Sequence, residues 1–158
     1  MSYLFVKYLH ILAAIFLFGF GMGSYLYLIA AKRSGDPRVI AQVAGMVVRF
    51  DNWITTPAGV LQLATGYAMA RMAGLDLTRG WLLSGVLIFF GVGALWLPVL
   101  ILQKRMQAVA AQADACGAAL GNEFLRLYRP WFYLGVAGFV GMFWVVAVMA
   151  MKSLPWPG

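Results

Sequence analysis

The chain has 158 residues, of which 63% are hydrophobic and 11% are charged, and its net charge is +7. A water-soluble domain of this size cannot bury so much apolar surface, so the composition excludes a soluble fold. Charged residues are absent from four long apolar runs, at 8–31, 53–70, 80–103 and 130–151. Because a helix crosses a bilayer with about 20 apolar residues, these runs predict an all-α, polytopic membrane protein built as a four-transmembrane-helix bundle.

One integral membrane domain is expected over residues 1–158, with transmembrane helices at about 4–31, 52–72, 80–103 and 129–151. The runs are continuously apolar rather than alternating, which favours helices over a membrane β-barrel. The first run is too long for the apolar core of a signal peptide, about 7–15 residues, so we expect this helix to be retained.

The first two connections carry clear local signals. SGDP at 34–37 is expected to end the first helix, and Pro37 suits the first turn of a new one. Apolar side chains recur at helical spacing over 38–50. This pattern is typical of an amphipathic helix that lies on the inner membrane surface or runs into the second span. The short stretch 74–80 predicts that the second and third spans are antiparallel neighbours.

The last connection, 104–129, is alanine-rich and contains Cys116, the one cysteine of the chain. A helix broken at Gly117 and Gly121 is expected there, with Asn122 as the cap of the helix that follows. A single thiol forms neither an internal disulfide nor a CxxC pair, which excludes thiol–disulfide enzymes.

The basic residues are distributed unevenly between the two sides of the membrane. Eight of the twelve fall in the two long connections: Lys32, Arg33, Arg38, Arg49, Lys104, Arg105, Arg126 and Arg129. By the positive-inside rule these amphipathic connections are cytoplasmic and the bundle is N-out/C-out. The basic surplus therefore suits anionic lipid headgroups and not nucleic acid. Glycines spaced for close helix packing serve either one bundle or a homodimer or larger complex.

His10 is the single histidine and lies inside the first span. An imidazole in the membrane suggests a ligand for b-type haem or another redox group, or for copper, while the structural alternative is a hydrogen bond across the bundle. Met149 is the methionine expected near the depth of His10, either as a second haem ligand or as core filling. Lys7, on the same face, would pair with a haem propionate or extend to the interface.

Other polar residues have mainly structural interpretations. Arg49, Asp51, Arg126 and Arg129 are expected to form an ionic cluster at the inner ends of the spans. Gln62 and Thr65 are expected to bond to backbone or to each other. The four apolar runs hold no aspartate or glutamate, whereas small proton-coupled exporters depend on a carboxylate in the membrane, which argues against a transporter.

The chain resembles a bacterial family of predicted integral membrane proteins, domain of unknown function 2269. The segments that carry the resemblance are YLHIL at 8–12, SGDP at 34–37, WITTPA at 53–58, WLP at 96–98 and RPW at 129–131. More distantly it is similar to copper-resistance D-type proteins and to haem-binding membrane protoporphyrinogen oxidases of the HemJ type. The latter similarity implies a haem ligand at His10 alone, because the lysine those oxidases use after a tryptophan has no counterpart after Trp81.

Three functions follow from the sequence. The leading one is a small inner-membrane protein that binds haem b or another redox ligand through His10. The second is a non-catalytic membrane scaffold or accessory subunit without a cofactor, in which His10 is a packing hydrogen-bonder. The third is a copper-handling membrane protein.

Overall fold

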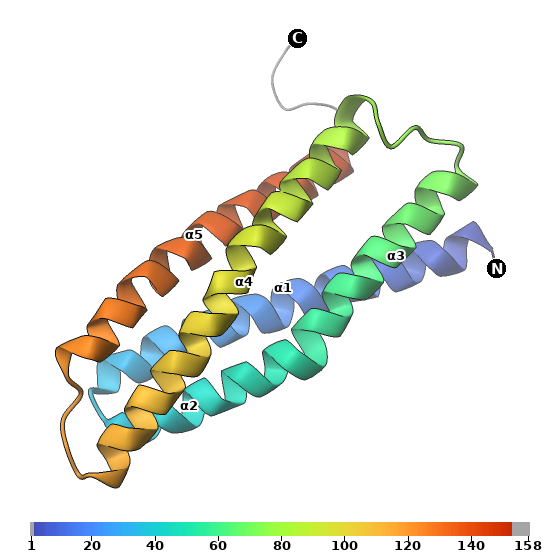
Figure 1. Ribbon diagram of the computed structural model, residues 1–158. Coiled ribbons are helices and arrows are strands. Elements are labelled where there is room, and N and C mark those ends of the chain that lie inside the picture. The colour runs from blue at the N-terminus through green and yellow to red at the C-terminus, as the bar shows by residue number, and fades with distance from the viewer. Residues whose placement is uncertain (1, 153–158) are drawn as a thin grey trace.

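The computed structural model describes residues 2–152 and is helical throughout its ordered elements. Their bounds are α1 (Tyr3–Ser34), α2 (Pro37–Phe50), the π-helical turn η1 (Asp51–Thr55), α3 (Thr56–Met72), α4 (Gly80–Ala115) and α5 (Asn122–Met151). The elements α2, η1 and α3 follow one another without a break and form one continuous helix, which bends between α2 and α3 (Figure 1). Within residues 2–152 there is no strand, which confirms the all-α prediction.

Three helices, α1, α4 and α5, are long and apolar enough to cross a membrane. The fourth predicted crossing corresponds to η1 and α3, and α3 itself has 17 residues, slightly fewer than the ~20 that a crossing needs. Only a small part of the apolar windows of α1, α4 and α5 is buried inside the bundle. Most of their apolar side chains therefore point outward, as expected for helices surrounded by hydrocarbon.

The chain breaks between α1 and α2 where the SGDP segment predicted it. Gly35 adopts a left-handed conformation with φ of 70° and ends α1. The Asp36 side chain then accepts a hydrogen bond of 2.8 Å from the Arg38 backbone N–H, which caps α2. Pro37 is the first residue of α2, where its missing N–H costs nothing.

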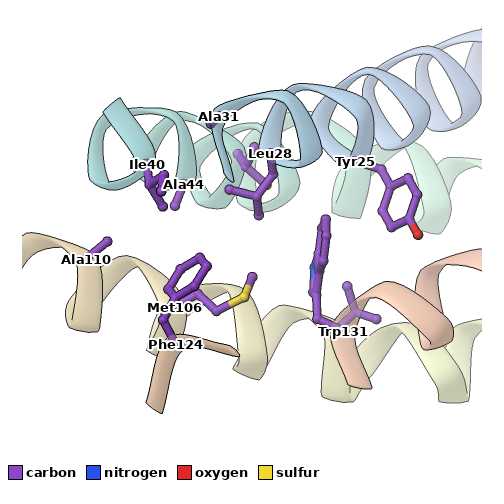
Figure 2. Close-up of a cluster of buried hydrophobic side chains, with 11 residues drawn as sticks. Tyr25, Leu28, Ala31, Ile40, Ala44, Met106, Ala110, Phe124 and Trp131 are labelled. Atoms are coloured by element: carbon purple, nitrogen blue, oxygen red, sulfur yellow. The ribbon is translucent and has the colours of Figure 1, made fainter. Parts of the chain in front are cut away.

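The amphipathic face of α2 is packed inside the bundle. Ile40, Ala44 and Val47 are buried and lie against α1 and the far end of α4. Figure 2 shows Ile40 and Ala44 facing Met106 and Phe124 across the bundle. Of the two predictions for residues 38–50, continuation into the second span is therefore correct. Lying flat on the membrane surface is not, because the neighbouring helices already cover the apolar face.

The second and third spans, predicted to be antiparallel neighbours, have other helices as their main packing partners. Helix α3 packs along α1, and α4 packs along α5 and α2, whereas α3 and α4 are not closely packed. The loop between them turns at Gly74 (φ of 66°), and the Asp76 carboxylate pairs with Arg79 at 3.4 Å. Two hydrogen bonds from Thr78 to Asp76 lower the pKa of that exposed carboxyl group. These contacts stabilise the loop locally. The two helices that it joins pack against other helices.

The last connection is mostly helical, as predicted. Helix α4 continues to Ala115 and the chain turns at Gly117, whose φ is 61°. The cap of α5 is Gly121 rather than Asn122, which is instead the first helical residue. Pro130 lies inside α5 and not at its start. Both α4 and α5 therefore extend past the apolar runs, at 103 and 130, and their extensions contribute to the packed core of Figure 2.

Candidate functional site

His10 lies half-buried on the face of α1 that meets α3, and both of its ring nitrogens are hydrogen-bonded. Nδ1 is 2.9 Å from the Thr65 hydroxyl oxygen, and Nε2 is 3.0 Å from the Gln62 amide nitrogen. The Thr65 hydroxyl also donates to the Leu61 carbonyl at 2.6 Å. Each ring nitrogen therefore has a hydrogen-bond partner on α3.

The geometry around His10 fixes α1 to α3. Gly66 lies beside the ring, and a Cβ at that position would approach the His10 Cε1 atom to 3.1 Å. Gln62 and Thr65 were expected to bond to backbone or to each other, and Thr65 does bond to the Leu61 carbonyl, whereas the Gln62 side chain bonds to His10. Their bonds to His10 depend on the packing of α1 against α3. No local sequence pattern predicts that packing.

Met149 and Lys7 have contacts or exposure of their own, and the hydrogen bonds of the His10 ring nitrogens go to α3. The Met149 methyl lies against Gly85 of α4, where a Cβ would overlap it, while His10 faces α3. Lys7 is exposed at the start of α1. Within residues 2–152 there is no group of three or more His, Cys, Asp or Glu side chains that could hold a metal ion. A haem iron or copper ion on His10 would have to replace Gln62 at Nε2.

The four residues of the predicted ionic cluster lie in different environments. Arg49, Arg126 and Arg129 are exposed, whereas Asp51 is only 2% exposed and points into the bundle. Over residues 2–152 the one ion pair is Asp76–Arg79, and Asp51 Oδ2 has no hydrogen-bond partner there. The helical turn at η1 therefore separates the Asp51 carboxyl group from the arginines near it in sequence.

Asp51 opens onto a cavity of about 340 Å³, the central cavity, which is bounded by α1, η1 with α3, α4 and α5. Its walls are almost entirely apolar. The polar exceptions gather where η1 faces α4, and they include Asp51, Thr55 and Gln103. All three are at least nine-tenths buried. A buried polar atom without a partner costs about 1–3 kcal/mol of folding stability. Three such atoms at one place therefore destabilise the folded chain.

Thr55 and Gln103 are the functional candidates that the sequence did not indicate. Gln103 ends an apolar run just before Lys104, and Thr55 lies in a segment whose signal was its proline. A polar residue at the edge of an apolar run usually faces the interface, and nothing in the local pattern says otherwise. Only the approach of α4 to η1 places both beside the Asp51 carboxyl group.

These features define the class of protein: an all-helical integral membrane protein with a buried polar group beside an apolar cavity. The chain belongs to the family of predicted integral membrane proteins DUF2269, whose match covers residues 4–153. No curated protein and no solved structure shows significant similarity to the chain. The resemblance noted from the sequence is therefore confirmed for this family, which by its description has no assigned function.

Proposed function

We propose that the protein is a membrane-embedded binding protein that takes apolar small molecules from the bilayer into the central cavity. The observation that carries the proposal is the cavity itself, about 340 Å³ and walled by four parts of the bundle. Ligand sites of this size are typically concave, largely apolar and preformed, with a few placed polar groups. The central cavity has each of these properties.

Access from the bilayer is supported by the helices that border the cavity. Helices α3 and α4 are not closely packed against each other, unlike α4 and α5 or α1 and α3. Val60 on α3 and Phe90 and Leu97 on α4 line the cavity, and they are also 64%, 58% and 61% exposed. Side chains that face both the cavity and the outside form the rim of an opening. A ligand dissolved in hydrocarbon would enter there without crossing water.

This function suits a bundle with four crossings, in which η1 and α3 form the short one. Arg71 is exposed at the end of α3 and can extend to the headgroups, which supports a crossing by so short a helix. Basic residues beside the α1–α2 and α4–α5 connections support an N-out/C-out orientation in a bacterial inner membrane. Anionic headgroups are then the lipid partners on the cytoplasmic side.

Ligand binding by His10 is the second candidate. The Nδ1–Thr65 hydrogen bond orients the ring in the way that outer partners orient histidine ligands of metals. A haem or copper ion would then take Nε2 in place of Gln62. Visible spectra and metal analysis of the purified protein, with and without His10→Ala, decide this role. A Soret band or bound copper that disappears in the variant would establish it. A colourless, metal-free protein leaves His10 as a structural hydrogen-bonder.

The cavity is tested by photolabelling in proteoliposomes with a neutral alkylbenzene that carries a diazirine. Label is expected on peptides from η1–α3 and α4 that line the cavity. Gly93 lines the cavity with open space at its Cβ, so Gly93→Leu should fill it and reduce this labelling several-fold. Gly91→Leu is the matched control, because Gly91 has the same open space but lies outside the cavity. Labelling that is unchanged in Gly93→Leu would refute the proposal.

A further inference from the structure

The polar end of the central cavity contains three buried oxygen atoms with unused hydrogen-bonding capacity. Asp51, Thr55 and Gln103 are 2%, 3% and 4% exposed, and Thr55 and Gln103 lie beside the Asp51 carboxyl group. The Asp51 Oδ2, Thr55 Oγ1 and Gln103 Oε1 atoms have no hydrogen-bond partner within residues 2–152. Two of the three atoms can only accept a hydrogen bond when the carboxyl group is ionised. The donors beside the carboxyl group, the Thr55 hydroxyl and the Gln103 amide, are neutral, so the site lacks positive charge.

The surrounding protein does not supply that charge. No lysine, arginine or histidine lines the central cavity within the described chain. Arg49 lies two residues before Asp51 in the chain, but its side chain is exposed and makes no ion pair with Asp51. A buried carboxylate in low dielectric is strongly unfavourable unless a cation or hydrogen-bond donor meets it. An anionic ligand is excluded for the same reason, because it would add a like charge at this point.

The remaining walls suit the apolar part of a cation. Six aromatic side chains line the cavity: Phe18, Tyr25, Phe89, Phe90, Trp96 and Phe139. The faces of aromatic rings attract organic cations through their negative quadrupole, and the effect is largest where water is excluded. A carboxyl group at one end of an aromatic cavity thus presents two separate features that favour positive charge. A neutral apolar ligand would use neither of them.

We propose that the central cavity selects a lipophilic organic cation, a protonated amine carrying apolar groups, with Asp51 as its counter-ion. The two N–H groups of a secondary ammonium donate to Asp51 Oδ2 and Gln103 Oε1, and the apolar groups lie among the aromatic rings. The inference rests on the proposed binding function and adds the charge of the ligand. The four apolar runs hold no carboxylate, but Asp51, just before the second run, is buried inside the bundle and supplies one to the cavity.

The test is competition against the diazirine photolabel in proteoliposomes of zwitterionic lipid. The competitors are N-benzylhexylamine, protonated at pH 7, and benzyl hexyl ether, its neutral isostere. In the wild-type protein the amine should displace the label at a concentration at least tenfold lower than the ether. Asp51→Asn should bring the amine to within threefold of the ether. Asp114→Asn is the charge-matched control, because Asp114 is exposed near the end of α4, and it should keep the wild-type ratio.

The outcomes separate this inference from the binding function. If the label does not react with the cavity, the binding function fails and the cation site fails with it. If the label reacts but amine and ether compete equally in the wild-type protein, the cavity stands and the selection for cations is refuted. Should Asp51→Asn not fold, Gln103→Leu replaces it, with a several-fold loss expected for the amine alone. An amine-to-ether ratio that survives either folded variant would also overturn the assignment.

Discussion

The ring of Tyr25 lies directly on the backbone of Gly135, so α1 and α5 meet there with no second side chain between them. The Tyr25 hydroxyl donates to the Phe132 carbonyl at 2.7 Å, and its ring lies 4.8 Å from that of Trp131. The contact holds the first and last helices together at the edge of the central cavity. It also explains one of the glycines in the repeated Gly135, Gly138, Gly141 spacing as packing within a single chain.

Gly135→Ala should destabilise the protein, because a methyl group at this position overlaps the Tyr25 ring. Overpacking of this kind costs about 1–3 kcal/mol. Thermal unfolding in mild detergent, followed by circular dichroism, should show a lower Tm. Gly138→Ala is the control, since its Cβ meets open space, and it should unfold near the wild-type temperature. Equal Tm values for the two variants would mean that Tyr25 moves away at no cost.

The stability of the bundle should depend mainly on the end shown in Figure 2. Leu28 is fully buried there, and Leu28→Ala should cost about 2–5 kcal/mol through the cavity it leaves. Leu87 on α4 is 61% exposed, and Leu87→Ala should cost much less because the side chain faces lipid in the folded state. Unfolding by denaturing detergent measures both. A Leu87→Ala cost as large as that of Leu28→Ala would contradict the assigned core.

The hydrogen bond between His10 and Thr65 should make a measurable contribution to the α1–α3 contact. Thr65→Val keeps the shape of the side chain and removes the hydroxyl, which should lower the free energy of unfolding by about 0.5–1.5 kcal/mol. Thr65→Ser retains the hydroxyl and should recover most of the loss. If Thr65→Val and the wild-type protein unfold at the same detergent concentration, the bond does not fix the two helices.

The orientation of the bundle can be tested with the natural cysteine. Cys116 is exposed in the connection between α4 and α5, which the charge bias predicts to be cytoplasmic. A membrane-impermeant maleimide should therefore label it only after the cells are permeabilised. In a Cys116→Ser background, Leu75→Cys reports the α3–α4 loop, where Leu75 is exposed, and should be labelled in intact cells. The reverse pattern would invert the predicted topology.

The sequence was sufficient for the class of protein and for several boundaries. Long uncharged runs predict membrane helices because hydrocarbon accepts no charges and no unpaired backbone groups. The helix break at Gly35 and Asp36 and the turn at Gly117 followed from local backbone preferences, which a few residues express without help from the rest of the chain. These features depend on short-range physics, so they can be predicted from the residues alone.

Only the tertiary structure decided which helices touch and where the polar groups meet. In a membrane, apolar side chains gain no hydrophobic free energy by moving from lipid to protein. Hydrophobicity therefore does not predict that α3 packs on α1 rather than on α4. The same ambiguity hid Asp51, which the charge pattern assigned to an arginine cluster and the fold placed at the end of an aromatic cavity. Residues distant in sequence, such as Asp51 and Gln103, form a site because two helices approach each other there.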